Sequence, residues 1–234
     1  MNSNQNKSNF SADLSQRKAV TILKPLYPIW MVVGLFGILI VPTILIVGDA
    51  TTTANNIMDN ELLFRMGIVS SLITQIIQIL VVLLLYKLLK PINKNIASLM
   101  VVFALVGVPI SMLNTLNQVA ALLLLNDPAQ MMFFLDLNEL GVQIATIFWG
   151  LWLLPLGFLV YKSGYFPRIL GVYLMIGCFG YLLDSFTHLI LLNYDDYEAI
   201  FFTVTFLLTM GEILFMGWIL VKGAKIPDTI TEAT

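Results

Sequence analysis

The sequence is short of charge, cysteine and histidine. Only 11% of its 234 residues are charged, whereas soluble domains carry roughly 25%. Its one cysteine, Cys178, lies in an apolar run, so an internal disulfide and a paired-cysteine metal or redox site are both excluded. Its one histidine, His188, argues against zinc sites and membrane hydrolases that use several histidines. We therefore expect no metal and no cofactor.

Sequence motifs of common enzymes are also missing. The chain has no GxSxG, no HExxH, no glycine-rich phosphate loop and no signature of a nucleic-acid-binding domain. The sequence therefore favours a role other than catalysis, and we expect no nucleic-acid partner.

Apolar residues dominate what is present. They make up 59% of the chain, and the mean hydropathy is +0.89. A bilayer core needs about 20 consecutive apolar residues per helix. Six stretches qualify, near residues 27–47, 66–86, 96–118, 142–161, 169–192 and 199–221. The pattern predicts an all-α, polytopic membrane protein: a polar N-terminal segment (1–26), a six-transmembrane-helix bundle (27–222) and a short tail (223–234).

The cations predict the orientation. If both termini are cytoplasmic, eleven of the twelve Lys and Arg residues lie on the cytoplasmic side, and Arg65 is the exception. The eleven are Lys7, Arg17, Lys18, Lys24, Lys87, Lys90, Lys94, Lys162, Arg168, Lys222 and Lys225. Because cytoplasmic loops carry the excess of Lys and Arg, we expect a multi-pass protein of the cell (cytoplasmic) membrane with both termini inside.

Acidic residues follow the opposite distribution. They fall in or beside the outer connections, at Asp49, Asp59, Glu61, Asp127, Asp136, Glu139, Asp195, Asp196 and Glu198. The outer face is therefore predicted to be acidic.

The third apolar stretch, from Ile96 to Leu125, is too long for one straight crossing. Pro109 could kink it, and the NDPAQ segment at 126–130 indicates a turn. We therefore expect the longest outer connection at about 119–141, where a lid would lie if there is one.

Polar residues recur at helical spacing inside four spans. The sets are Ser71, Gln75 and Gln78; Ser111, Asn114 and Gln118; Tyr181, Asp184 and His188; and Thr205, Thr209 and Glu212. Each set lies on one helix face, and lipid cannot satisfy its hydrogen bonds, so the four faces are predicted to converge on a shared interior. The alternative is that the neutral groups only hold helices together, at about 0.6 kcal/mol per contact.

The two carboxylates, Asp184 and Glu212, favour function. Each costs about 2.5–3.5 kcal/mol at mid-span, so such acids usually mark a working site. The predicted depths keep the two apart, and we expect Asp184 to pair with Arg65; Arg65 with Glu139 is the competing pair. His188 is either a neighbour that changes charge near neutral pH or an ordinary interfacial histidine. The candidate site is Arg65, Asp184, His188, Glu212, Gln75, Gln78, Asn114 and Thr209.

Four segments carry a family resemblance: FRMGIVSSL (64–72), LYKLLKPINKNIA (85–97), GEILFMGWILVKG (211–223) and, most specific, residues 148–186 from FWGLWLLPLGF to FGYLLDSF. They resemble a bacterial family of small multi-pass membrane proteins known only as a domain of unknown function. The resemblance implies that Arg65, Asp184 and Glu212 stand where the family pattern has Arg, a polar group and Glu. His188 lies outside the pattern. The family implies no activity.

Three classes of function remain open. The leading one is binding or translocation of a small solute or proton at the polar intramembrane site. The second is an accessory or sensory membrane protein, and the third is a lipid-modifying enzyme. Membrane lipids are expected partners, a second copy or another membrane protein is a further candidate, and the ligand is not specified. A water-sized channel reaching Asp184 would favour transport, and a dry network would favour the accessory role.

Overall fold

The computed structural model describes residues 15–45, 48–191, 194 and 197–227, and within them every regular element is helical. The elements are α1 (Gln16–Ile40), the short 3₁₀ helix η1 (Val41–Ile44), α2 (Ala50–Asp59), α3 (Glu61–Leu89), α4 (Lys94–Leu123), α5 (Pro128–Leu151), α6 (Leu153–Ser163), α7 (Arg168–Ile190) and α8 (Glu198–Val221). Six described helices, counting α5 and α6 as one, are long and apolar enough to cross a membrane. The predicted six-helix bundle is confirmed.

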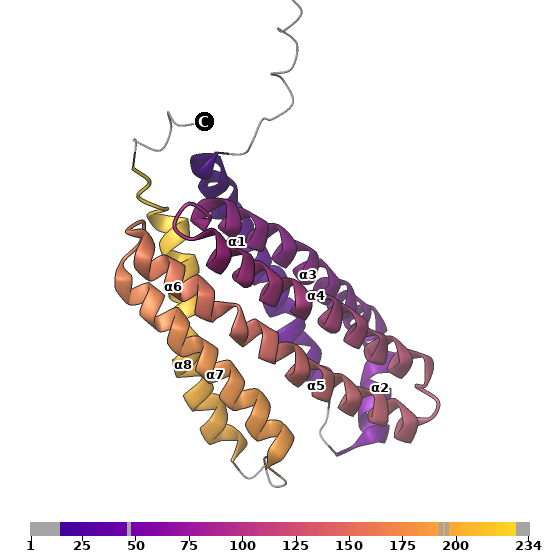
Figure 1. Ribbon diagram of the computed structural model, residues 1–234. Helices are drawn as coiled ribbons and strands as arrows, with labels where there is room; N and C mark the ends of the chain where they lie inside the picture. The colour runs from indigo at the N-terminus through magenta and orange to yellow at the C-terminus, as the bar shows by residue number, and fades with distance from the viewer. Residues whose placement is uncertain (1–14, 46–47, 192–193, 195–196, 228–234) are drawn as a thin grey trace, which may run out of the picture.

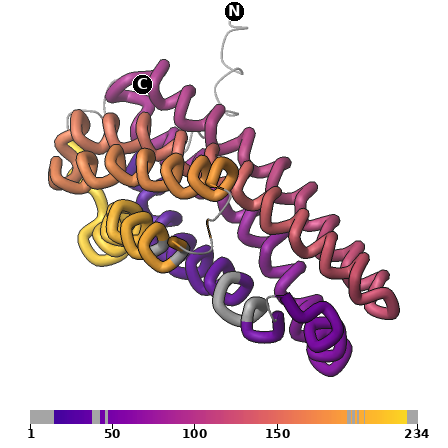
Figure 2. Tube along the Cα trace, turned by 90° about the horizontal axis from the view of Figure 1, so that it is seen from below, coloured from indigo at the N-terminus to yellow at the C-terminus, as the bar shows by residue number. Residues whose placement is uncertain are grey.

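The spanning helices pack as a closed ring. Along the chain α1 contacts α3, α3 contacts α4, α4 contacts α5 and α6, and α7 contacts α5, α6 and α8. Contact between α1 and α8 closes the ring, and Figure 2 shows α1 lying between α8 and α3.

The start of α1 and the end of α8 lie at the same end of the bundle (Figure 1). Side-chain and backbone bonds tie this end together. Gln16 Nε2 donates to the Leu88 carbonyl at 2.6 Å, and the Lys225 amide donates to the Tyr165 carbonyl at 3.0 Å. We call this the basic end, because the predicted inner lysines and arginines of the described residues lie at it. The opposite, acidic end carries α2 and the turn from α4 to α5 (Figure 1). Lys7, Asp195, Asp196, the Glu198 side chain and residues 228–234 lie outside the description.

The short turn between α4 and α5 corrects the expected outer loop. The α4 helix continues through Pro109 to Leu123, and α5 begins already at Pro128. The turn is short because Asp127 caps α5, its carboxylate accepting from the Gln130 amide at 3.2 Å, and Pro128 suits the first helical position. The expectation of a long connection at 119–141, the place given for any lid, was wrong.

The first span also differs in extent. The α1 helix starts at Gln16, eleven residues before the predicted apolar stretch, and ends at Ile40. The segment after it folds into the helix α2, capped by Asp49, whose carboxylate accepts from the Thr52 amide at 2.8 Å. Nothing in the apolar pattern indicated α2, because only Thr53, Ala54 and Ile57 of it are buried.

The fourth span breaks at Trp152, between α5 and α6. Pro155 has no N–H to donate to the Leu151 carbonyl, so the helical ladder is interrupted there. Beyond the break α6 packs closely on α7: a Cβ added to Gly157 would lie 2.6 Å from the Gly171 carbonyl oxygen. The largest core cluster surrounds this half of the bundle and includes Trp152.

Candidate functional site

Glu212 of α8 is the most deeply placed carboxylate in the spans. Tyr181 of α7 donates its hydroxyl to Glu212 Oε2 at 3.2 Å. Tyr27 of α1 is 2% exposed and lies near enough to Glu212 to interact with its carboxylate electrostatically. We call these three residues the central site. They come from three helices that contact one another in the order α7, α8, α1.

The three residues of the central site include a carboxylate but no cationic side chain to neutralise it. In the described part of the chain, no Lys or Arg pairs with Glu212, whose hydrogen-bond partner is the neutral Tyr181. A carboxylate at mid-span opposes insertion by about 2.5–3.5 kcal/mol, and one neutral donor compensates for only part of that. The arrangement therefore favours a bound proton or another small cation.

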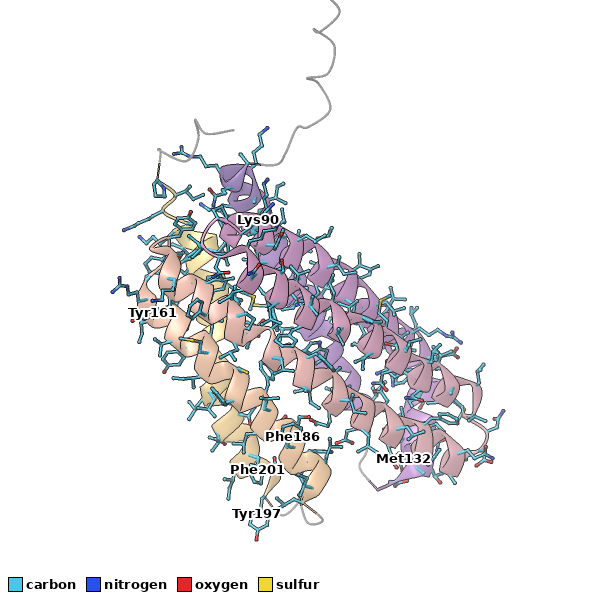
Figure 3. All side chains as sticks on the ribbon, viewed as in Figure 1. Lys90, Met132, Tyr161, Phe186, Tyr197 and Phe201 are labelled. Atoms are coloured by element: carbon cyan, nitrogen blue, oxygen red, sulfur yellow. The ribbon has the colours of Figure 1, made fainter. Side chains whose placement is uncertain are left out.

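A second polar group lies nearer the acidic end. Asp184 Oδ1 accepts from the Tyr194 hydroxyl at 3.3 Å, and His188 Nε2 lies 3.6 Å from Glu139 Oε1 of α5. The His188 and Tyr194 rings are 4.4 Å apart. We call Glu139, Asp184, His188 and Tyr194 the outer site. Phe201, labelled near this end in Figure 3, stacks on Tyr194 at 5.7 Å.

Tyr181 stands between the two sites on α7. It binds Glu212 directly and precedes Asp184 by three residues, so both carboxylates act on one helix face. In the outer region, His188 Nδ1 is buried without a hydrogen-bond partner. The outer site therefore retains unused hydrogen-bonding capacity.

Arg65 belongs to neither site, which corrects the expected ion pair. Its guanidinium bonds to Glu61 of its own helix, with Nη2 to Oε1 at 2.6 Å and both side chains about half exposed. The spacing of four residues on one helix brings Glu61 within reach without any tertiary contact. Neither Asp184 nor Glu139 is its partner in the structure: they bind Tyr194 and His188.

The α3 glutamines are buried, as their spacing predicted. Gln75 and Gln78 are 7% and 5% exposed, and the Oε1 atom of each has no hydrogen-bond partner in the described structure. The same holds for Gln143 Oε1 of α5. Each of these oxygens can accept a hydrogen bond from water or from a ligand, since buried carbonyl groups are normally hydrogen-bonded.

Asn114 forms hydrogen bonds with residues of α5 and not with Asp184 or Glu212. Its Nδ2 donates to the Asn138 carbonyl at 2.8 Å, and Asn138 Nδ2 returns a bond of 3.3 Å to the Asn114 carbonyl. Asn117 donates to Asn114 Oδ1 at 2.9 Å, and Gln118 donates to Asn138 Oδ1 at 3.2 Å. We call these four residues the amide cluster. It holds α4 against α5.

Thr209 is satisfied by its own helix, through a bond of 2.9 Å to the Thr205 carbonyl. The polar faces of α7 and α8 thus meet through Tyr181 and Glu212, whereas the α4 face bonds to α5 instead. The acids of the two sites lie on α5, α7 and α8. Sequence reasoning missed Tyr27, Tyr194, Asn138 and the pairing of Glu139 with His188. A tyrosine between two prolines, Pro25 and Pro28, was the available signal for Tyr27.

Two grooves lie between helices on the surface of the bundle. One, of about 480 Å³, lies between α7 and α8; the other, of about 550 Å³, lies between α1 and α3. Neither is lined by Asp184 or Glu212. Within the described ranges, no cluster of three or more His, Cys, Asp or Glu side chains could hold a metal ion.

Comparison with known proteins assigns the chain to a family but does not indicate an activity. Residues 25–223 match the family model described as a domain of unknown function, DUF4386. An uncharacterised protein of Archaeoglobus fulgidus is 35% identical over 165 residues, which cover 70% of this chain and 88% of that protein. No solved structure matches. The chain therefore belongs to the DUF4386 family.

Proposed function

We propose that this protein binds a proton, or another small cation, at Glu212 in the middle of the membrane. One observation carries the proposal: a mid-span carboxylate whose hydrogen-bond partner is a neutral tyrosine, with no ion pair to a described Lys or Arg. A proton neutralises the charge and removes most of the cost of keeping it in the bilayer.

A proton suits this site better than a larger solute. The carboxylate is closely bounded by Tyr181, and neither described groove reaches it. Proton transfer needs hydrogen-bonded groups and not a solute-sized cavity. The outer site, with two carboxylates and a histidine nearer the acidic end, supplies hydrogen-bonding groups along which a proton would reach Glu212.

The same site would serve a sensor. If the proton binds without crossing, the change in charge at Glu212 alters the balance of contacts among α1, α7 and α8, which is the accessory or sensory function. We further propose that the basic end faces the cytoplasm of the cell that carries the protein.

The test is infrared difference spectroscopy of the purified protein in liposomes, stepped between two pH values. We expect a protonated-carboxyl stretching band that is absent in Glu212→Gln, which keeps the size and hydrogen bonding of the side chain. Asp127→Asn, at the exposed cap of α5, is the control and should leave the band unchanged. A band that persists in Glu212→Gln would show that Glu212 is not the site.

Proton flux into the same liposomes, followed with an enclosed pH dye, separates the two functions. Flux above that of empty liposomes, lost in Glu212→Gln, supports translocation. A titrating band without flux supports the sensor. Absence of both overturns the proposal.

A further inference from the structure

The groove between α1 and α3 combines apolar walls with a positively charged end. Its volume is about 550 Å³. It is lined by Ile22 and Leu26 of α1, and by Leu80, Leu83, Leu84, Tyr86, Lys87 and Lys90 of α3. Ile22, Leu80 and Leu83 are 42%, 48% and 47% exposed, so the groove is open to the surface of the bundle.

Hydrogen bonds fix the two helices that form its walls. At the basic end, Gln16 Nε2 of α1 donates to the Leu88 carbonyl of α3 at 2.6 Å. Further along, the Trp30 indole N–H donates to the Thr74 carbonyl at 3.2 Å. The separation of the helices is therefore set at both ends, and the groove is preformed.

The charges gather at one end of the groove. Lys87 and Lys90 belong to the last turn and the cap of α3, and Lys90 Nζ lies 5.7 Å from the centre of the Tyr86 ring. Figure 3 shows Lys90 at the basic end of the bundle. Lys18, which does not line the groove, is exposed on α1 four residues before Ile22, toward the same end of the bundle.

We propose that this groove binds an anionic phospholipid of the leaflet at the basic end. An acyl chain would lie along Leu80, Leu83 and Ile22, and the phosphate would meet Lys87 and Lys90. The apolar walls of the groove match the acyl chain of such a lipid, and its cationic end matches the headgroup. Basic pockets between membrane helices are known to bind anionic headgroups.

The groove between α7 and α8 provides the contrast. It is lined by apolar residues and Thr187, without any charged side chain. An acyl chain of any lipid could rest there, but nothing would select an anionic headgroup. The selectivity proposed for the first groove therefore depends on its lysines.

The test is native mass spectrometry of the full-length protein in detergent, titrated with phosphatidylglycerol or with phosphatidylcholine of the same acyl chains. We expect one phosphatidylglycerol to bind more tightly than phosphatidylcholine. The double variant Lys87→Gln/Lys90→Gln should bind phosphatidylglycerol about thirtyfold more weakly, since each lysine near an anionic surface contributes separately. The control Lys162→Gln/Arg168→Gln removes the same charge at the turn from α6 to α7 and should bind normally.

A second pair tests the apolar part. Leu83→Trp fills the groove, whereas Leu99→Trp places the same side chain on α4, at a similar depth and with 44% exposure against 47%. Only Leu83→Trp should displace the lipid. Equal weakening by both double variants would show non-specific attraction, and equal binding of the two lipids would show that there is no headgroup site. A lipid-free dimer that Leu83→Trp disrupts and Leu99→Trp does not would show that a second copy fills the groove. Each of these results overturns the proposal.

Discussion

The hydroxyl of Tyr181 donates to the carboxylate of Glu212 across the interface of α7 and α8, at 3.2 Å. This bond ties the one mid-span acid of α8 to the helix that carries Asp184 three residues further on. Any change in the charge of Glu212 therefore acts on α7 through Tyr181, which links the central site to the outer site.

A double-mutant cycle of Tyr181→Phe and Glu212→Gln measures this link. We expect a coupling energy of about 0.6–1.7 kcal/mol from thermal or denaturant unfolding in detergent, the range of hydrogen bonds between membrane helices. Tyr27→Phe is the matched control, because Tyr27 lies near Glu212 without a hydrogen bond to it, and its coupling should be smaller. Equal couplings for the two tyrosines would contradict the assignment of the bond.

The orientation of the bundle can be tested with reporter fusions. Fusions after Asp59 and Pro128 should report the outside, and fusions after Asn93 and Gly164 the cytoplasm, because the described lysines and arginines other than Arg65 gather at the second of these faces. One reproducible reversal among the four would reject the proposed orientation, although the helical bundle itself would stand.

The six spans were predictable because bilayer thickness fixes the length of an apolar run. Their ends were less so. The α5 helix begins at Pro128, well before the expected start at 142, and Asn138 in this extension bonds to Asn114 of α4, a pairing that depends on how the two helices are rotated. Apolar counting placed Asn138 in a loop because it takes no account of a partner on another helix.

Among the partners of the charged residues, those on the same helix were predictable from the sequence and those on different helices were not. Glu61 with Arg65 was available from the sequence, because four-residue spacing on one helix is a local relationship. Two other contacts, His188 with Glu139 and Tyr181 with Glu212, join different helices, so predicting them requires the relative register of α5, α7 and α8. That register is set by packing, and no pattern within one helix specifies it.

Gly157 should be intolerant of alanine. A Cβ there would lie 2.6 Å from the Gly171 carbonyl oxygen and 2.8 Å from the Met175 amide nitrogen, both backbone atoms that cannot move aside cheaply. We expect Gly157→Ala to destabilise the protein by about 1–3 kcal/mol, measured as a lower melting temperature in detergent. Gly217→Ala is the control: nothing lies within 4 Å of its Cβ position, and alanine favours the helix, so stability should hold or rise. Equal losses would mean that helix α6 is not packed this closely on α7.

The cap of α2 should depend on pH. Asp49 accepts hydrogen bonds from the hydroxyl and the amide of Thr52, which hold the pKa of its carboxyl below its usual value. Because the folded state prefers the ionised form, the cap contributes fully above the pKa of the unfolded chain, about 3.9, and is lost as the pH falls through the lower folded value.

Hydrogen exchange of the amides in α2 measures this cap. Protection, corrected for the intrinsic pH dependence of exchange, should fall on acidification below about pH 4. Asp49→Asn keeps an acceptor that does not titrate and should remove the pH dependence. The first turn of α4, capped by Asn93, is an internal control in the same molecule. Parallel losses in both turns would indicate general acid unfolding instead of a titrating cap.

The amide cluster permits a rescue experiment at Gly141. A Cβ on this residue would lie 1.9 Å from Asn114 Oδ1, and Asn114 cannot swing away without losing its bonds to Asn138 and Asn117. Gly141→Ala should therefore lower the melting temperature by an amount equivalent to about 1–3 kcal/mol. Asn114→Ala should cost about 1 kcal/mol through its lost hydrogen bonds.

Combining the two substitutions separates the clash from any other effect of alanine. Once Asn114 is alanine, the space beside Gly141 is open, and the better helix propensity of alanine should make Gly141→Ala neutral or stabilising in that background. The sign of the Gly141→Ala effect should thus reverse between the two backgrounds, a non-additivity that only contacting residues produce. If Gly141→Ala costs the same with and without Asn114, the two side chains do not meet, and the close approach of α4 and α5 at the amide cluster is wrong.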